Sequence, residues 1–329
     1  MTTTAPARTA LPAAGVIAAG LTVSYLVSLA VPAVSVLTAA VLLGILAGNL
    51  PVLPAAARPG LRSATRTLLR SGVVLLGLQL AVPELLGLGA GTIAAIAVTV
   101  AVGFLGTMAL GRLLRLPRGL TVLVATGFSI CGASAIAAME GVVRRRDDEV
   151  ATAIALVTLY GGLAIFAVPL AGSALGLGDA LVGRWAGLAV HEVAQVVAAA
   201  APAGAAAVAV AAVVKLGRVV LLAPMVAGMS LVERRAHSGS TTRRPPLVPL
   251  FVLGFLAAAA LRTTGWLPDP ALAVARTATT ALLGAALFGL GCAVDLRSVL
   301  RTGPRALLLG LLSTLLVAGT ALGGLLLLG

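Results

Sequence analysis

Eleven long apolar runs occupy most of this 329-residue chain, and no stretch between them is long enough to fold as a soluble domain. A membrane-spanning helix needs about 20 apolar residues. Continuous runs favour helices, because a membrane barrel is built from alternating segments of about ten residues. The sequence therefore predicts an all-α polytopic membrane protein with about 11 transmembrane helices (10–11), folded as a single integral membrane domain over residues 1–329. The runs are 11–30, 33–50, 68–83, 91–111, 119–142, 151–172, 184–202, 205–231, 247–265, 272–294 and 306–328.

Composition supports the same class and excludes two others. Hydrophobic residues make up 60% of the chain and charged residues only 10%, far from the usual soluble balance. A net charge of +13 could suggest a nucleic-acid partner, but aromatic residues for base stacking are only 3%. We therefore expect membrane lipid as a partner and no nucleic acid. The first run lacks a sharp small-residue cleavage site, so we interpret it as a retained span.

The arginines predict the orientation of the chain. With the N-terminus inside and strict alternation, fifteen arginines fall on inner loops and five on outer loops. This excess predicts a cytoplasmic N-terminus and an odd number of spans. The cluster Arg144, Arg145 and Arg146 is the exception, because alternation places it outside.

A weak internal repeat supports the same topology. Gly77 and Leu78 match Gly289 and Leu290 at an offset of 212 residues. The third and tenth predicted helices would then run in opposite directions, as in the inverted repeats of secondary transporters. We expect repeat halves at about 33–172 and 184–329, although Ala/Leu/Gly-rich chains also produce such matches by chance.

Ionisable residues inside two apolar runs are the first candidates for function, because charge is costly in the membrane. His191, Glu192 and Gln195 would share one face of a helix. The alternative is a polar patch at the membrane interface. Lys215 and Arg218 are three residues apart and would also share a face, near mid-membrane. Here the alternative is that both long side chains extend to the interface.

Two further features lie at a similar depth. The stretch Gly127–Ser134 (GFSICGAS) combines glycine and serine in mid-span, which permits a broken helix whose free N–H groups attract anions. Close helix packing through small residues is the alternative. Gln79 is the other feature, and it would equally suit a buried interhelical hydrogen bond.

These residues together predict a site for an anion near the bilayer midplane. Lys215 and Arg218 supply two positive charges and Glu192 one negative charge, so an anion would reduce a charge imbalance that is expensive in lipid. We expect Lys215, Arg218, Ser129, Ser134 and Gln79 to bind the anion. Glu192, His191 and Gln195 would respond to a coupling proton or sodium ion.

Four segments resemble a known family. They are Leu68–Leu80 (LLRSGVVLLGLQL), Gly127–Ala138 (GFSICGASAIAA), His191–Ala199 (HEVAQVVAA) and Val214–Pro224 (VKLGRVVLLAP). They are similar to the signature segments of conserved hypothetical bacterial membrane proteins named as sulfate exporters, from the second span to the C-terminus. This resemblance implies a multi-pass protein of the bacterial inner membrane that exports sulfate or a sulfonate. A more distant similarity to bile-acid/sodium symporters and sodium–proton antiporters implies that helices around 119–142 and 184–202 are broken and cross.

Three functions of different classes follow from these features. The leading one is a secondary transporter of a small anion. The second is an anion channel, which passive conductance would distinguish from saturable flux. The third is an intramembrane serine hydrolase, with Ser129 or Ser134 beside His191, but Ser129 lacks a G-x-S-x-G frame because Cys131 takes its last position. We expect no enzyme activity, catalytic residue, metal or cofactor, and a homodimer is a further arrangement that the sequence permits.

Overall fold

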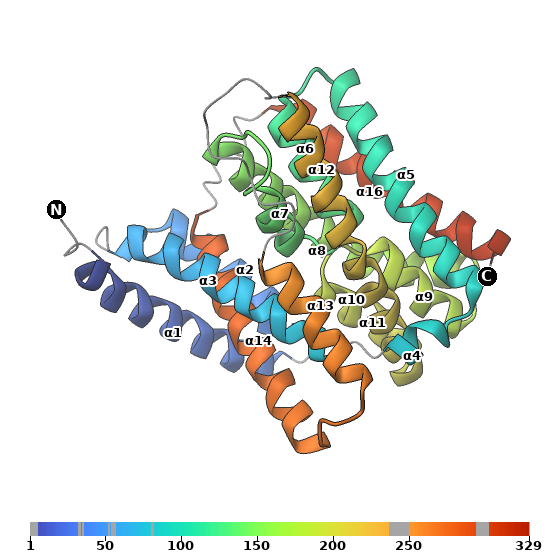
Figure 1. The fold of residues 1–329 in the computed structure, drawn as a ribbon, viewed down its shortest axis with the longest axis horizontal. Coiled ribbons are helices and arrows are strands. Elements are labelled where there is room, and N and C mark those ends of the chain that lie inside the picture. The colour runs from blue at the N-terminus through green and yellow to red at the C-terminus, as the bar shows by residue number, and fades with distance from the viewer. Residues whose placement is uncertain are drawn as a thin grey trace.

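A computed structural model describes residues 6–31, 34, 36–51, 53, 57–79, 82–236, 250–293 and 303–328, and all of the regular structure in them is helical (Figure 1). The α-helices are α1 (Pro6–Ala30), α2 (Val36–Asn49), α3 (Arg58–Leu76), α4 (Val82–Leu86), α5 (Ala90–Leu113), α6 (Arg118–Ser129), α7 (Ala133–Met139), α8 (Asp147–Ala174), α9 (Asp179–Ala189), α10 (Val193–Ala200), α11 (Ala205–Val220), α12 (Leu222–Ala236), α13 (Leu250–Thr263), α14 (Asp269–Cys292) and α16 (Pro304–Leu328). Two 3-10 turns are η2 (Gly77–Gln79) and η3 (Ala201–Ala203).

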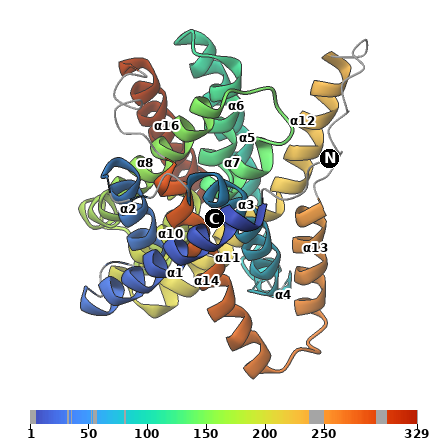
Figure 2. The same cartoon turned by 90° about the vertical axis from the view of Figure 1, so that its left-hand side faces the viewer.

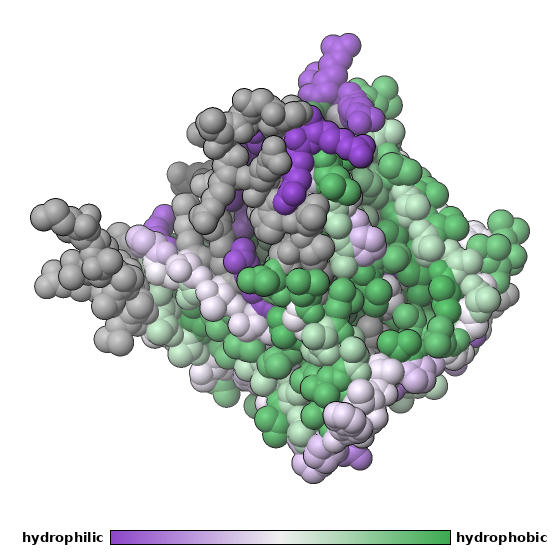
Figure 3. Space-filling model, in the orientation of Figure 1, coloured by the Kyte–Doolittle hydropathy of each residue, from purple (hydrophilic) through white to green (hydrophobic). Residues whose placement is uncertain are grey.

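Six helical segments in the described part of the chain are long and apolar enough to cross a membrane, which agrees with a multi-pass membrane protein. They are Pro12–Ala30, Ala90–Leu113, Asp148–Ala174, Ala205–Arg235, Asp269–Cys292 and Pro304–Leu328. Two shorter apolar helices, Ala39–Asn49 and Leu253–Thr263, correspond to two more of the predicted runs. The space-filling view shows the result, with hydrophobic residues across the middle of the molecule and hydrophilic ones at the upper edge (Figure 3).

Helices α6 and α7 form a hairpin and not a span. Gly119, at the start of α6, lies against Arg145 and Glu149 at the start of α8, and Gly127 near its end lies against Val157. Helices α6 and α8 therefore run in the same direction. Helix α7 must return to the end of the molecule where α6 began, and Gly127 is indeed packed against Ile136 of α7.

Helices α9 and α10 form a second hairpin of the same kind. Gly183 and Gly187 of α9 lie against Ala207 and Ala211 of α11, so α9 and α11 run in the same direction. Because α10 leads directly into η3 and α11, it has to return to the end where α9 began. We call the end of the molecule where α6 and α8 begin face A, and the end where α8 ends and α9 and α11 begin face B.

The prediction of two full spans at 119–142 and 184–202 is therefore wrong, whereas the predicted break in each segment is confirmed. Their crossing stays a prediction. Each run has the length and composition of a span, but its middle turns back. Gly132, with φ of +74°, makes the turn after α6, a backbone region that side chains rarely adopt. In the second run, residues Val190 and Glu192 are extended and end α9. The hairpins enter from opposite ends, α6–α7 from face A and α9–α10 from face B.

Helices α5 and α16 cover the hairpins and run in opposite directions. Gly103 of α5 lies against Val317, and Gly324 at the other end of α16 lies against Ala95. Small residues recur along this face of α5 and allow the close approach. Helix α6 is buried at every position from Gly119 to Ser129, so protein and not lipid surrounds it. The main hydrophobic core contains α6 residues such as Phe128 and Leu123.

Helix α3 begins earlier than the apolar run that predicts it. The run starts at Leu68, but the helix starts at Arg58, so Arg58, Arg62 and Arg66 belong to a helix and not to a loop. Arg243, Arg244, Arg297 and Arg301, which also enter the orientation argument, lie outside the described residues.

Candidate functional site

The tips of the two hairpins meet inside the molecule, and this meeting point gathers most of the predicted site residues. The backbone N–H of Ala133, in the first turn of α7, donates to Oε1 of Glu192 at 3.4 Å. Gly132 lies against the same side chain, so that a Cβ there would come within 2.5 Å of Glu192 Cγ. Close contact between the tips therefore requires glycine at position 132.

The tip of α6–α7 carries no ionisable side chain apart from the Cys131 thiol. Ile130 donates from its backbone to the carbonyl of Thr126, and Gly132 donates to the carbonyl of Gly127. The hydroxyl of Ser134 donates to the Cys131 carbonyl at 3.1 Å and lies 3.2 Å from the Cys131 sulfur. Ser134 thus stabilises the turn itself, and its part in anion binding stays a prediction.

The tip of α9–α10 is built by a reciprocal cap at the start of α10. Glu192 occupies the N-cap position, and its backbone N–H donates to Oε1 of Gln195 at 3.2 Å. Carboxylate and amide side chains at these positions satisfy N–H groups that a helix start leaves free. Gln195 also packs against Gly161 of α8. The expected common helical face is wrong, because residues 190–192 are not helical, yet His191, Glu192 and Gln195 do lie together at the tip.

Arg218 of α11 joins the two hairpins. It is fully buried, and its guanidinium donates to backbone carbonyls at the ends of both α6 and α9. Nε donates to Ser129 O at 2.9 Å and Nη2 to Phe128 O at 2.7 Å. Nη1 donates to Leu188 O and, at 3.4 Å, to Val190 O. These carbonyls belong to the last turns of two helices, where a helix leaves its carbonyls without partners and carries partial negative charge.

Lys215 makes a similar but smaller contact. Its ammonium is also fully buried and donates to Val190 O at 2.7 Å. An ammonium has three donors, so this bond leaves two of them for another acceptor, whereas most of the five donors of Arg218 are engaged. The snorkelling alternative is wrong for both cations, because neither side chain reaches the surface.

The helix ends partly offset the charges at the tips, in a way that the sequence did not indicate. The cations lie at the negative ends of α6 and α9, and the Glu192 carboxylate lies at the positive starts of α7 and α10. No ion pair joins Glu192 to Lys215 or Arg218, all three of which the structure describes. Two cations and one carboxylate still leave a formal excess of one positive charge.

His191 lies behind the tip of α9–α10, fully buried. Its Nε2 is 3.1 Å from Oγ1 of Thr314 in α16, and its ring lies 4.3 Å from the Phe128 ring, centroid to centroid. Thr314 is a site residue that our sequence analysis missed. Its signal is the pair Ser313–Thr314, which interrupts a run of leucines in the middle of the last apolar run.

Two predicted ligands have no side-chain hydrogen bond to either cation among the described residues. The buried Ser129 hydroxyl lies against Gly103 of α5 and makes no hydrogen bond among the described residues, while its carbonyl accepts from Arg218. Gln79 lies in η2, which packs mainly against α3, α13 and α14, and its part in anion binding stays a prediction. Neither Ser129 nor Ser134 hydrogen-bonds His191, so the arrangement does not favour a serine hydrolase.

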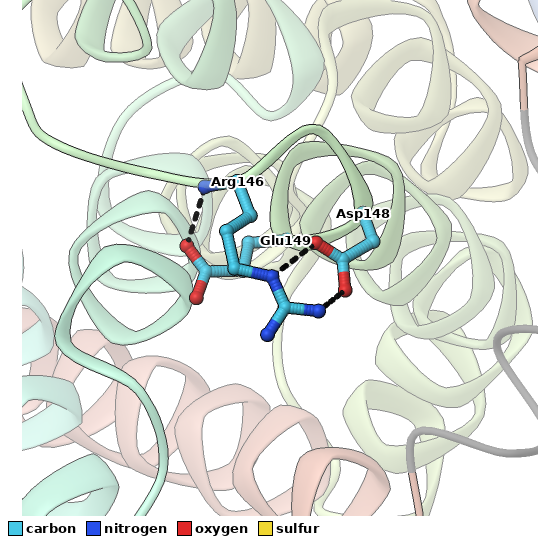
Figure 4. A network of polar contacts seen from close by, with 3 residues as sticks. All are labelled: Arg146, Asp148 and Glu149. Carbon is cyan, nitrogen blue, oxygen red and sulfur yellow. Dashed lines mark hydrogen bonds and ion pairs between the residues drawn. The ribbon is translucent and has the colours of Figure 1, made fainter.

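Ion pairs surround the base of α6–α7 at face A. Arg118 lies 2.6 Å from Glu233 of α12, and Arg145 lies 3.3 Å from Glu140. The backbone N–H of Arg146 donates to Glu149 at 3.0 Å, and its guanidinium pairs with Asp148 (Figure 4). Helices α6 and α12 lie together at the upper edge of the view, consistent with these contacts (Figure 1). In the view turned by 90°, α6 and α12 again lie at the same end of the molecule (Figure 2). Among the described residues, no group of three or more His, Cys, Asp or Glu side chains could hold a metal.

Comparison with known proteins identifies relatives along nearly the whole chain. Residues 13–310 match the family described as Conserved hypothetical protein 698. A UPF0324 membrane protein of Corynebacterium glutamicum is 46% identical over 295 residues, covering 89% of this chain and 86% of the relative. One from Agrobacterium fabrum is 35% identical, covering 87% of this chain and 82% of the relative.

Among solved structures, the sodium proton antiporter MjNhaP1 of Methanocaldococcus jannaschii matches 96% of this chain and 98% of its own, at 13% identity. The TM-score is 0.32, which does not establish a common arrangement of the helices.

Proposed function

The chain belongs to the conserved hypothetical protein 698 family, whose UPF0324 relatives are membrane proteins, and on that premise we propose that it is a secondary transporter of a small anion. We expect sulfate or a sulfonate, the anions that the sequence resemblance implies. The observation that carries the proposal is the meeting of two hairpin tips from opposite faces beside a buried ammonium with free donors. Secondary transporters commonly place their substrate between broken helices near the midplane.

Each residue at or beside the hairpin tips has a separate role in this proposal. Lys215 binds the anion, because two of its three donors have no hydrogen-bond partner among the described residues and the site carries a formal excess of positive charge. Arg218 positions the two hairpins, since its donors are bound to their carbonyls. Glu192 responds to the coupling proton or sodium ion, because its carboxylate links the two tips directly. His191, Gln195, Ser129 and Ser134 support these groups.

The hairpins also suggest a pair of opposed units, which is separate from the repeat at an offset of 212 residues. A hairpin followed by a long helical segment occurs twice, as α6–α8 and as α9–α12, and the two units enter from opposite faces. Helices α5 and α16 are likewise antiparallel. We propose that these opposed units give the transporter two related conformations, one open to each side.

The same hairpins refine the proposed orientation. Because α6–α7 returns to face A, Arg144, Arg145 and Arg146 move to the side of the other loop arginines and the exception disappears. Among the arginines that the structure describes, thirteen then lie toward face A, with sides assigned from their helices, and Arg184, Arg262 and Arg276 lie toward face B. By the positive-inside rule we propose that face A and the N-terminus are cytoplasmic, in the bacterial inner membrane.

Transport by the purified protein in proteoliposomes tests the proposal. We expect saturable uptake of sulfate or a sulfonate by the wild type, strong loss in Lys215→Ala, and unchanged uptake in Arg276→Ala, a cation on the exposed side of α14. Folding of each variant is checked by its elution as a monodisperse protein. Flux that does not saturate would favour a channel, and the absence of Lys215-dependent flux for every anion tested would contradict the proposal.

A further inference from the structure

Helix α3 carries a row of arginines that the hairpin site does not use. Arg58, Arg62, Arg66 and Arg70 recur at every fourth residue, and residues 58–76 contain no carboxylate. Four-residue steps on an α-helix advance by about 40°, so the four positions lie within roughly 120° of arc. Like charges at this spacing repel each other by a few tenths of a kcal/mol (about 0.2–0.5 per pair), so an anion bound beside the row would stabilise α3.

The side of α3 that holds the helix in place borders the arginine row: at 100° per residue, Leu69 lies about 20° from Arg58 and about 100° from Arg70. Leu61 and Leu69 are buried, Thr65 lies against Gly289 of α14, and Gly72 lies against Leu283 of the same helix. Arg58 and Arg70 are exposed, and neither makes an ion pair with any residue that the structure describes. Packing therefore fixes α3 through the side that borders the row, and leaves Arg58 and Arg70 exposed.

Exposed hydroxyls and apolar side chains lie next to the arginines. Ser63, Thr67 and Ser71 of α3 are all exposed. The guanidinium of Arg70 lies over the Phe251 ring, 5.8 Å from its centroid, at the start of α13. On α13, Leu250 is 86% exposed and Leu253 is 48% exposed. Cationic and hydroxyl donors thus adjoin an apolar surface.

We propose that α3 and the start of α13 bind an anionic phospholipid from the leaflet at face A. The phosphate takes hydrogen bonds from Arg70 and the Ser71 hydroxyl, and an acyl chain lies along Leu250 and Leu253. Clusters of basic residues at the cytoplasmic surface of membrane proteins recognise anionic headgroups in this way. Asp295 follows α14 outside the described residues, and one carboxylate could not offset four arginines.

Lipid-dependent thermal stability of the detergent-solubilised protein tests this site. A lipid that binds the folded state raises its melting temperature. We expect phosphatidylglycerol to raise it more than twice as far as phosphatidylcholine at equal concentration, and inorganic phosphate to leave it unchanged. Arg70→Gln should weaken the apparent affinity for phosphatidylglycerol about tenfold, the effect of losing one charged hydrogen-bond donor. Arg276→Gln, an exposed arginine toward face B, should behave as the wild type, and Arg70→Lys should keep most of the affinity.

Three results would overturn the proposal: equal stabilisation by both lipids, the full shift with inorganic phosphate alone, or an unchanged affinity in Arg70→Gln. The comparison of the two lipids on the wild type decides the matter without a variant if Arg70→Gln does not fold. The test does not depend on transport, so its outcome is separate from that of the proposed function.

Discussion

The two hairpins have the same shape but differ in where their charges lie. Hairpin α6–α7 has ion pairs at its base, including Arg118 with Glu233, and a tip that offers backbone groups. Hairpin α9–α10 has its ionisable residues, His191 and Glu192, at the tip. Among the described residues its base has no ion pair, and the indole of Trp185 ties α9 to the Ala318 carbonyl at 2.9 Å. We infer that α6–α7 stays in place during transport and that α9–α10 carries the group that responds to the coupling ion.

The largest expected effect comes from removing the side chain that both hairpins share. Arg218→Ala leaves buried carbonyls of Phe128, Ser129 and Leu188 without their donor. Breaking a buried charged network of this kind costs about 3–5 kcal/mol. Lys215→Ala removes a single hydrogen bond from a charged group and should cost less, about 1–3 kcal/mol. Thermal unfolding in detergent measures both, and a larger loss for Lys215→Ala would show that Arg218 does not join the hairpins.

The proposed roles of the two hairpins predict opposite results for variants at the two tips. Glu192→Gln keeps the shape of the side chain but removes its charge, so anion uptake should lose its dependence on an imposed proton or sodium gradient. Cys131→Ser changes the tip of α6–α7 and should keep that dependence. Uptake into proteoliposomes with and without the gradients measures both variants. Gradient dependence that survives Glu192→Gln would place the coupling group elsewhere.

Variants of two glycines distinguish the cost of backbone strain from the cost of a collision between the tips. Gly132 and Gly204 both have positive φ, +74° and +91°, with extended ψ, a region close to glycine-only where a side chain costs about 1–3 kcal/mol. A Cβ at Gly204 meets nothing within 4 Å, but one at Gly132 collides with Glu192. Gly132→Ala should therefore lower the melting temperature more than Gly204→Ala does. Equal losses would mean that the tips are not in close contact.

The smallest effect is expected at the base of α6–α7. The Arg118 side chain is 55% exposed, although its partner Glu233 is buried. A double-mutant cycle with Arg118→Gln and Glu233→Gln should give a coupling energy of about 0.2–1 kcal/mol, smaller at high salt. A coupling energy several times larger would mean that this ion pair, and not the packing of α6, holds the hairpin.

Sequence reasoning located the helices and the broken segments but not their direction. Every apolar run contains helix, and the break falls within Gly127–Ser134 as the glycines and serines indicate. That α6–α7 turns back depends on long-range contacts, such as Gly119 with Glu149, which leave no periodic signal in the chain. The cluster Arg144, Arg145 and Arg146, which strict alternation placed outside, was the one local indication of this turn. The carbonyl partners of Arg218 could not be predicted either, because backbone acceptors are common to all residues.

The central claim is that α6–α7 and α9–α10 are hairpins from opposite faces, and thiol labelling in intact cells tests it most directly. With Cys131 and Cys292 replaced by serine, single cysteines replace the exposed residues Arg115 and Arg144, before and after α6–α7, and Asp179 and Ala201, before and after α9–α10. A membrane-impermeant maleimide should label Asp179→Cys and Ala201→Cys from outside, and Arg115→Cys and Arg144→Cys only after permeabilisation. Labelling of Arg115→Cys and Arg144→Cys from opposite sides would contradict the account.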